Sequence, residues 1–333
     1  MTVGTGEKTT PTAPRVGAVI LAAGKGTRLK TELPKVLHEV CGRPMLAYVI
    51  DACRAAGVKE CVVVVGYQKD LVIRAFTEDR DLTWVEQNPQ LGTGHAVMVC
   101  REHLAGRFDH LFVLAGDGPL IRAETLRTLI ERHLAEQAAV TLATAVLDDP
   151  TGYGRIWRDA EGRLLGIVEH GDATPEQKRI HEVNPSYYCF KQPELLAALD
   201  QVRPNNVKNE YYITDAISIL LAGGHKVQAI TSVPPQDIFS INSRQELAMV
   251  NAVMRDRILD RLMSSGVTIV DPRTTWIDDR ATIGQDTVIH PNVVISGPAI
   301  IGRGCRIGPF VNLTGAARVP DHGVISPFAG GVA

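Results

Sequence analysis

Two glycines and three cationic side chains lie close together near the start of the chain, directly after an apolar run. Gly24 and Gly26 flank Lys25, Arg28 follows, and Lys35 comes seven residues later. Glycine lets backbone N–H groups approach a phosphate closely, and the cations supply charge, so this segment predicts a site for a nucleotide triphosphate. It matches neither a dinucleotide fingerprint nor a Walker loop. Taken alone, the segment is equally well interpreted as a glycine-rich turn with solvated charges.

Two oxygen-bearing side chains follow apolar runs further along the chain. Asp117 comes after the run 111–115, and Asn242 comes after the run 237–241. Mg²⁺ prefers hard oxygen ligands and completes its shell with phosphate and water, so a carboxylate and an amide oxygen suit it. Spacing alone favours a simpler interpretation, in which Asp117 forms a turn and Asn242 opens a helix.

These side chains need a scaffold, and the pattern from Val16 to about Leu147 supplies one. Short apolar runs predict strands, and stretches with helical spacing alternate with them at 45–56, 94–104 and 123–136. The strands are expected at 17–21, 61–65, 82–85, 111–115 and 140–146. Such alternation predicts an α/β fold with a mostly parallel sheet and helices on both faces. Ligands of such sheets bind beyond the carboxyl ends of the strands.

The rest of the chain contains two further features. A long helix is expected over 244–265, because Ser243 and Glu246 form a capping-box pattern before it and Gly266 follows it. After this helix, nine aliphatic residues recur every six positions from Ile277 to Ile325. A six-residue repeat of this kind is typical of a parallel β-helix.

Bulk properties exclude several function classes. A net charge of −2 over 333 residues gives no electrostatic argument for binding nucleic acid or an anionic membrane. No apolar run approaches the about 18 residues that span a bilayer, and residues 1–15 lack the apolar core of a signal peptide. The six cysteines show no metal or disulfide spacing, so we expect reduced thiols and a cytoplasmic protein.

Ordered motifs along the chain are more specific than any single residue. The segments 21–28 and 33–35 resemble the signature of the sugar-1-phosphate nucleotidyltransferases, also called sugar-nucleotide pyrophosphorylases. The resemblance continues in order at Gln87 and at 90–96, 116–119, 152–155, 167–170, 182–184, 209–215 and 241–242. Over about residues 16–270 the chain is most similar to the uridylyltransferase half of the bifunctional bacterial enzymes that make UDP-N-acetylglucosamine.

The resemblance implies a Rossmann-like, GT-A-like nucleotidyltransferase domain that joins UTP to N-acetylglucosamine 1-phosphate with Mg²⁺ as cofactor. It implies that Arg28 and Lys35 face the reacting phosphates and that Asp117 and Asn242 hold the metal ion. The nucleotide-binding residues it implies are Leu21, Ala22, Ala23, Gly24, Lys25, Gln87, Gln90, Gly92 and Thr93. The sugar-binding residues it implies are Gly154, Glu169, Asn184, Tyr212 and Thr214.

Together these observations predict four segments. We expect a disordered tail at 1–15, a nucleotidyltransferase domain at 16–242, a connecting helix at 243–266, and a short left-handed β-helix at 267–333. By resemblance, the β-helix assembles a homotrimer.

Two departures from the family pattern affect the expected function. The family usually has Asn-Thr-Gly where this chain has Asn184-Pro185-Ser186, so the loop beneath the sugar is expected to differ in shape. The bifunctional members also carry a catalytic histidine and an Asn-Tyr-Asp-Gly segment for acetyl transfer, and neither is matched here. His290 and His322 lie within the repeats but outside that motif. We therefore expect uridylyl transfer without acetyltransferase activity.

Three alternatives stay open at this point. The enzyme could use another sugar 1-phosphate, such as glucose 1-phosphate, although Asn184 favours an acetamido sugar. The chain could instead be a hexapeptide-repeat acyltransferase or a catalytically silent sugar-nucleotide sensor. The retained Arg28, Lys35, Asp117 and Asn242 favour an active nucleotidyltransferase.

Overall fold

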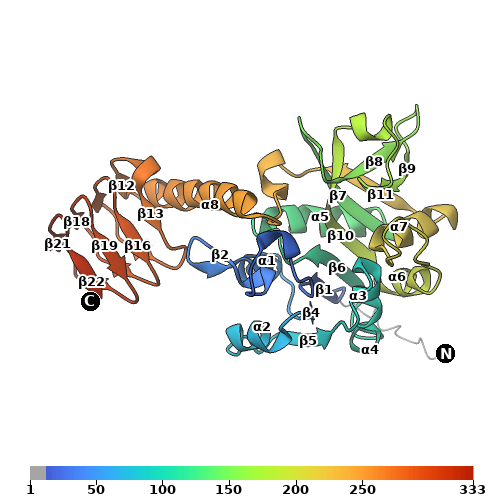
Figure 1. The fold of residues 1–333 in the computed structure, drawn as a ribbon, viewed down its shortest axis with the longest axis horizontal. Helices are drawn as coiled ribbons and strands as arrows, with labels where there is room; N and C mark the ends of the chain where they lie inside the picture. The colour runs from blue at the N-terminus through green and yellow to red at the C-terminus, as the bar shows by residue number, and fades with distance from the viewer. Residues whose placement is uncertain (1–12, 333) are drawn as a thin grey trace, which may run out of the picture.

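The computed structural model describes residues 13–332, which form an α/β domain and a β-helix joined by one long helix, α8 (Arg244–Ser264; Figure 1). The expected disordered tail falls mostly on residues 1–12, outside the described residues. Arg15, at the end of that expected tail, forms an ion pair with Asp109 at 2.9 Å. The chain is therefore held against the α/β domain from Arg15 onward.

The central sheet has the strand order β11-β7-β10-β6-β1-β4-β5. Along this order, β10 alone runs antiparallel, to β6 and to β7, so the expected mostly parallel sheet is confirmed. All five residues of β4 are buried, as expected for a strand covered on both faces. The strands are β1 (Val16–Leu21), β4 (Cys61–Val65), β5 (Leu82–Glu86), β6 (His110–Ala115), β7 (Val140–Val146), β10 (Glu182–Lys191) and β11 (Val227–Thr231).

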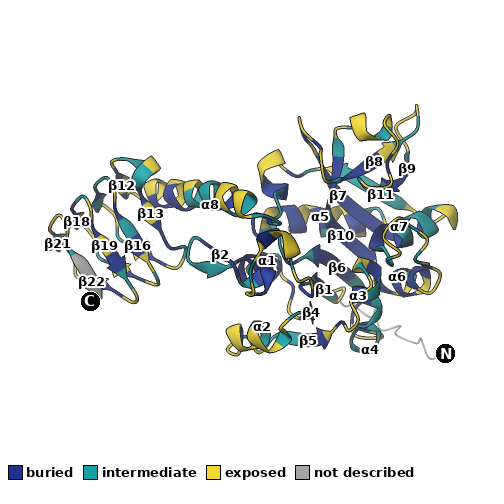
Figure 2. Cartoon of the chain, viewed as in Figure 1, coloured by how far each residue is buried: buried dark blue, intermediate teal, exposed yellow. Residues whose placement is uncertain are grey.

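Helices cover both faces of this sheet and create two apolar cores. Ile20 belongs to the core under α1, α5 and α8, whereas its neighbour Val19 belongs to the core under α3, α6 and α7. This alternation follows from the two-residue period of a strand. Figure 2 shows the inner strands of the sheet mostly buried, the edge strands β5 and β11 only partly buried, and the outer faces of the helices exposed. The helices are α1 (Met45–Ala55), α2 (Lys69–Ala75), α3 (Thr93–Met98), α4 (Arg101–Leu104), α5 (Ala123–Ala135), α6 (Gln192–Leu199) and α7 (Ile213–Ala222).

Two small hairpins extend the α/β domain. Strands β8 (Gly154–Arg158) and β9 (Leu164–Val168) pair with each other, and β8 also pairs with β10. Strands β2 (Glu39–Val40) and β3 (Arg43–Pro44) form the second hairpin. Gly42 in its turn contacts the β-helix so closely that a Cβ there would lie 1.8 Å from Asp278 Oδ2. The second hairpin therefore braces the α/β domain against the β-helix.

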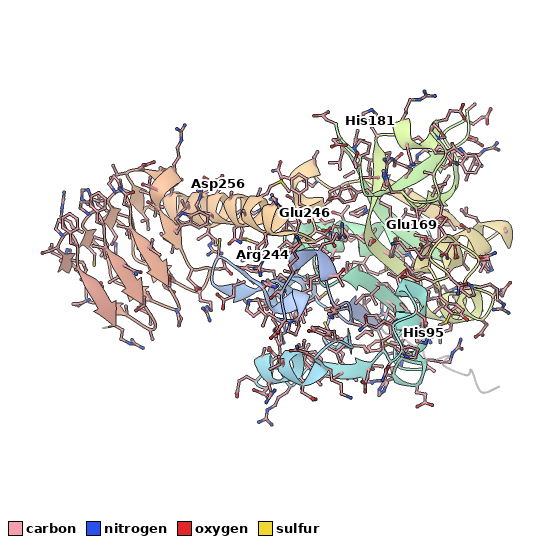
Figure 3. All side chains as sticks on the ribbon, viewed as in Figure 1. His95, Glu169, His181, Arg244, Glu246 and Asp256 are labelled. Atoms are coloured by element: carbon pink, nitrogen blue, oxygen red, sulfur yellow. The ribbon has the colours of Figure 1, made fainter. Side chains whose placement is uncertain are left out.

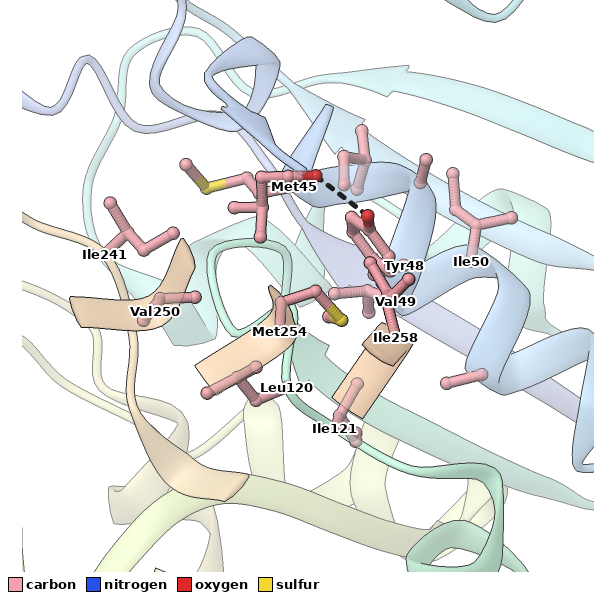
Figure 4. Close-up of a cluster of buried hydrophobic side chains, with 14 of the residues drawn as sticks. Met45, Tyr48, Val49, Ile50, Leu120, Ile121, Ile241, Val250, Met254 and Ile258 are labelled. Atoms are coloured by element: carbon pink, nitrogen blue, oxygen red, sulfur yellow. Dashed lines mark hydrogen bonds between the residues drawn. The ribbon is translucent and has the colours of Figure 1, made fainter. Parts of the chain in front are cut away.

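Helix α8 (Arg244–Ser264) connects the two parts. Ser243 Oγ accepts a hydrogen bond from the Glu246 backbone N–H at 3.2 Å, as the capping-box pattern predicts. Figure 4 shows Val250, Met254 and Ile258 of α8 packed among side chains of α1 and the segment around Leu120. Buried Asp237 adds ion pairs with Arg257 of α8 and with Arg122. Apolar packing and buried charge thus fix α8 to the α/β domain.

The β-helix consists of three parallel sheets whose strands recur once per turn. Ile277 pairs with Ile295, and Ile295 pairs with Leu313, a spacing of 18 residues (295 − 277 and 313 − 295) that corresponds to three hexads. The repeated aliphatic residues are buried from Ile277 through Val319, so the predicted repeat is confirmed. Its strands are β12 (Thr268–Ile269), β13 (Trp276–Ile277), β14 (Thr282–Ile283), β15 (Val288–Ile289), β16 (Val294–Ser296), β17 (Ile300–Ile301), β18 (Arg306–Ile307), β19 (Asn312–Thr314), β20 (Arg318–Val319), β21 (Val324–Ile325) and β22 (Gly330–Val332).

Two sequence-based expectations can be compared directly with this architecture. All six cysteines are free thiols, and all except Cys41 are buried. Across residues 13–332, no helix is both long enough and apolar enough to cross a bilayer.

Candidate active site

A cleft lies along the carboxyl edge of the parallel strands and consists of two adjoining cavities. The first, of about 330 Å³, is lined by residues that follow β1, β5 and β6. The second lies beside β8, β10 and the start of α8. Both cavities are lined by Ala115, Asp117 and Ser186, so they meet at these residues. Two ligands could therefore bind side by side and react where the cavities join.

The first cavity contains most of the residues expected to bind the nucleotide. Those that line it are Leu21, Ala23, Gly24, Gln87, Gln90, Gly92 and Thr93. Ala22 is buried next to them without lining the cavity. Lys25 is exposed, and its Nζ lies 5.2 Å from the centre of the Tyr67 ring instead of lining the cavity.

Hydrogen bonds hold the walls of the first cavity together. Gln87 Nε2 donates to the Gly92 carbonyl at 2.9 Å and lies 3.1 Å from His95 Nδ1. Gln90 Nε2 donates to the Ala23 carbonyl at 2.7 Å, which ties the loop after β5 to the loop after β1. Thr93 Oγ1 accepts from the Ile213 N–H at 3.0 Å. Burial lowers the pKa of His95, which favours the neutral ring beside Gln87.

Gly92 shows why a glycine is required in this wall. Its φ of 106° is in a region that other residues rarely adopt, and a Cβ would lie 2.6 Å from the Tyr211 carbonyl oxygen. The next glycine, Gly94, donates its N–H to that same carbonyl at 2.7 Å. The absence of a side chain at Gly92 thus allows the two segments to pack together.

Lys35, Asp117 and Asn242 meet where the two cavities join. The Lys35 ammonium donates a hydrogen bond to Asp117 Oδ2 and another to Asn242 Oδ1, the latter at 2.6 Å. Lys35 begins a short 3-10 helix, Asp117 follows β6, and Asn242 precedes α8. The two side chains expected to hold a metal ion thus converge on one cationic group.

Asn242 is itself positioned by Glu246. Its backbone N–H donates to Glu246 Oε2 at 2.7 Å, and both residues line the second cavity. Figure 3 shows Arg244 and Glu246 at the end of α8 that meets the α/β domain. The cap of the connecting helix is therefore part of the cleft wall.

Arg28 enters the cleft separately from Lys35. It lies in the short 3-10 helix Thr27–Leu29, is exposed, and lines the second cavity, whereas Lys35 lines the first. The two cations therefore lie on different sides of the junction, where they could contact different phosphate groups.

Three of the five expected sugar residues, Gly154, Glu169 and Asn184, line the second cavity. Thr214 is buried behind them and donates its hydroxyl to Glu169 Oε1 at 3.2 Å. Burial raises the pKa of Glu169, and the hydrogen bond from Thr214 opposes that shift. Tyr212 lines neither cavity, and desolvation raises its pKa to about 12.

The segment that departs from the family pattern has an unusual backbone. Ser186 has a φ of 64°, a left-handed conformation that disfavours any residue with a Cβ. The pairing between β10 and β7 shifts register between Val183 and Tyr187, so the chain bulges at this position. Ser186 consequently lies between the two cavities.

Sequence reasoning missed several residues that line the cleft. Tyr188 and Glu210 line the first cavity, and Tyr153 and Ser240 line the second. Tyr153 and Glu210 stand inside the recognised motifs, so the motifs supplied a signal for them. Tyr188 had no such signal, because its place in the cleft depends on the bulge in β10.

Comparisons with known proteins agree with this arrangement. Residues 18–210 match the MobA-like NTP transferase domain, and residues 280–315 match the bacterial transferase hexapeptide repeat. The chain is 42% identical over 327 residues to the bifunctional protein GlmU of Heliobacterium modesticaldum, covering 94% of this chain and 71% of that protein. It is 46% identical over 296 residues to the bifunctional protein GlmU of Halalkalibacterium halodurans, covering 89% of this chain and 65% of that protein.

Solved structures share the fold of the α/β domain. A putative glucose-1-phosphate thymidylyltransferase from Bacillus anthracis, in complex with a sucrose, aligns with a TM-score of 0.62 at 18% identity and covers 72% of this chain and 96% of its own. A UDP-glucose pyrophosphorylase complexed with UDP-glucose aligns with a TM-score of 0.61 at 20% identity. The alignment covers 72% of this chain and 98% of the pyrophosphorylase chain. At these identities the likeness establishes the fold alone.

Proposed function

The chain belongs to the GlmU family of nucleotidyltransferases, and from this we propose that it forms UDP-N-acetylglucosamine and pyrophosphate from UTP and N-acetylglucosamine 1-phosphate. The observation that carries the proposal is the convergence of Lys35, Asp117 and Asn242 between two adjoining cavities. A reaction between two phosphorylated ligands needs a charged junction of this kind.

The proposed step is a displacement at the α-phosphorus of UTP. An oxygen of the sugar phosphate forms the new P–O bond, and the bond to the pyrophosphate oxygen breaks, so no protein nucleophile is required. Each pair of like unit charges at about 4 Å repels by about 4 kcal/mol at an effective dielectric constant of about 20. Lys35 and Arg28, which line the two cavities, offset part of this repulsion.

The donor set at the junction fits Mg²⁺. Asp117 and Asn242 offer one carboxylate and one amide oxygen, and both already hold a single cationic group between them. Within residues 13–332, no cluster of three or more His, Cys, Asp or Glu side chains offers a metal site. Two protein ligands suit an ion that takes the rest of its shell from phosphate and water. When bound, Mg²⁺ neutralises charge on the phosphates.

Side chains away from the junction recognise the two substrates. We assign the uracil to Gln87 and the backbone at Gly92 and Thr93, because an amide and main-chain groups match its two carbonyls and one N–H. We assign the sugar to Glu169 and Asn184, with Gly154 beside them. Thr214 acts from behind this wall through its hydrogen bond to Glu169, whereas Tyr212 lines neither cavity.

A pyrophosphate-release assay tests the proposal. Purified protein with Mg²⁺ and UTP is given N-acetylglucosamine 1-phosphate, glucose 1-phosphate or glucosamine 1-phosphate at equal concentrations. We expect the highest kcat/KM with the acetamido sugar, because Asn184 can hydrogen-bond its amide. A preference for glucose 1-phosphate would assign the alternative substrate, and no pyrophosphate with any sugar phosphate would contradict the proposal.

Acetyl transfer and assembly are tested separately. We propose that this polypeptide has no acetyltransferase activity, because His290 and His322 do not occur in the family's acetyl-transfer motif. Acetyl-CoA consumption with glucosamine 1-phosphate would contradict this.

We also propose that the β-helix forms a homotrimer. Phe310 and Phe328 support self-association because their exposed rings stack at 5.2 Å on its surface. Light scattering of the whole protein gives the oligomer mass.

A further inference from the structure

The Lys35 side chain fills the position between the two proposed metal ligands. Its ammonium contacts both Asp117 Oδ2 and Asn242 Oδ1. The side chains of Lys35 and Asp117 are only 11% and 21% exposed, so this ion pair is largely shielded from water. Within the described chain, Lys35 is the only cationic side chain that pairs with Asp117. The protein therefore supplies a positive charge of its own at the junction.

We infer that Lys35 competes with the divalent metal ion for Asp117 and Asn242, so that the ion binds well only when nucleotide phosphates draw Lys35 away. This inference rests on the proposed function, because it takes Asp117 and Asn242 as the ligands of Mg²⁺. It assigns Lys35 a second role besides contact with the reacting phosphate.

The packing of Lys35 restricts its movement to the end of the side chain. A Cβ at Gly26 would lie 2.8 Å from Lys35 Cβ and 3.1 Å from both Cγ and Cδ, so the stem lies against the glycine-rich loop. Lys35 also lines the first cavity together with Gly24. With the stem held there, the terminal ammonium can turn from the Asp117 and Asn242 oxygens toward phosphates in that cavity. The loop that is expected to bind phosphate thus also fixes the lysine.

Charge explains why the exchange depends on nucleotide. Within the site, Asp117 supplies one negative charge and Lys35 balances it. A divalent ion entering beside Lys35 would add two positive charges, and the two cations would repel each other. Nucleotide phosphates add negative charge that attracts both cations, so each can find a separate partner. By linkage, the metal ion and the nucleotide then strengthen each other's binding.

Metal binding without nucleotide tests the competition directly. Mn²⁺ is titrated into the protein, and the free ion is measured by electron paramagnetic resonance. Lys35→Met removes the competing ammonium and leaves Asp117 available, so we expect Mn²⁺ to bind about tenfold more tightly than to wild type. Lys30→Met is the matched control, because it removes one positive charge from an exposed residue of the same segment. It should bind Mn²⁺ like wild type.

Two further variants keep the test decisive. If Lys35→Met does not fold, as judged by circular dichroism, Lys35→Gln replaces it, since it removes the charge but keeps a polar side chain. Adding Asp117→Asn to the Lys35 variant should abolish the extra Mn²⁺ affinity. Equal affinities in wild type, Lys35→Met and Lys35→Gln would overturn the inference, and so would a gain that persists after Asp117→Asn.

The inference and the proposed function fail in distinguishable ways. Wild-type pyrophosphate release is measured in parallel with the Mn²⁺ titration. Pyrophosphate release together with unchanged Mn²⁺ affinity in the Lys35 variants contradicts only the competition. An Asp117-dependent gain in affinity without pyrophosphate from any sugar phosphate supports the competition and contradicts the proposed reaction.

Discussion

Asn184 and Tyr188 connect the two cavities of the cleft through one hydrogen bond. Asn184 Nδ2 donates to Tyr188 Oη at 2.6 Å, and its Oδ1 accepts from the Ser186 N–H at 3.1 Å. Tyr188 lines the nucleotide side, whereas Asn184 lines the sugar side. The amide that we assign to the sugar is therefore held in place by a residue of the nucleotide cavity.

Tyr188→Phe should weaken sugar binding. Removing the hydroxyl leaves the Nδ2 donor of buried Asn184 unsatisfied, which lowers the free energy of unfolding by about 1–3 kcal/mol. It also frees the Asn184 side chain to turn. We expect KM for the sugar phosphate to rise about tenfold, with a smaller change in KM for UTP. Steady-state kinetics with each substrate varied in turn measures both constants.

Tyr187→Phe is the matched control for this prediction. Tyr187 lies on the same strand and donates to the Asp237 carbonyl at 2.9 Å, but it lines neither cavity. It should lower stability with little effect on either KM. If Tyr188→Phe and Tyr187→Phe have the same kinetic constants, the link between Tyr188 and the sugar is wrong.

Ser186→Gly should stabilise the protein. The φ of 64° at Ser186 disfavours a residue with a Cβ, and glycine removes that penalty at some loss of chain entropy. We expect the free energy of unfolding in urea to rise by up to about 1 kcal/mol. Ser186→Ala keeps the Cβ and should show no such gain. A less stable glycine variant would indicate that the serine hydroxyl contributes more than the backbone strain removes.

Glu246→Ala should reduce activity through Asn242. Glu246 Oε2 accepts from the Asn242 N–H, so its loss releases the segment that presents the Asn242 side chain. We expect kcat/KM to fall about tenfold, which corresponds to about 1.4 kcal/mol. Glu246→Gln keeps an acceptor oxygen and should retain most of the activity.

Ser243→Ala separates helix capping from positioning in the same region. It removes the cap acceptor for the Glu246 N–H, a loss of about 1 kcal/mol of stability, but leaves the Glu246 contact to Asn242 in place. Activity should therefore stay close to wild type after correction for folded protein. Equal losses of activity in Ser243→Ala and Glu246→Ala would assign both effects to the helix end alone.

Stability should fall as the pH drops below about 6.5, because of His133. This residue is fully buried between His110 and Thr141, and burial lowers its pKa to about 4. The unfolded chain binds a proton at His133 near pH 6.5, whereas the folded chain does so only near pH 4. Stability is thus complete above pH 6.5 and is lost between these values, by about 2 kcal/mol at pH 5.

Urea unfolding at pH 7.5 and pH 5 measures this loss. His133→Gln keeps a polar side chain that does not titrate, so the difference in unfolding free energy between the two pH values should shrink by about the same amount. An unchanged difference in His133→Gln would assign the pH dependence to other groups, of which the half-buried His110 is the nearest.

Regular elements of this protein could be predicted because their patterns are local. The strand run 61–65 is apolar at every position, as a doubly covered strand requires, and the structure has β4 at Cys61–Val65. The hexads behave in the same way, since each repeat places one aliphatic residue in the interior. The helix expected at 94–104 was only partly right, because it divides into α3 and α4.

Residue types and order alone determined the fold class, the repeat and the motifs after the strands, because these depend on burial and spacing along the chain. Only the tertiary structure decided that Lys35 meets Asp117 and Asn242, which lie 82 and 207 residues away. It also decided that Arg28 lies apart from Lys35 and that Tyr212 lies outside the cleft lining. Such contacts depend on how strands and helices pack, and no local pattern encodes the distance between residues so far apart in sequence.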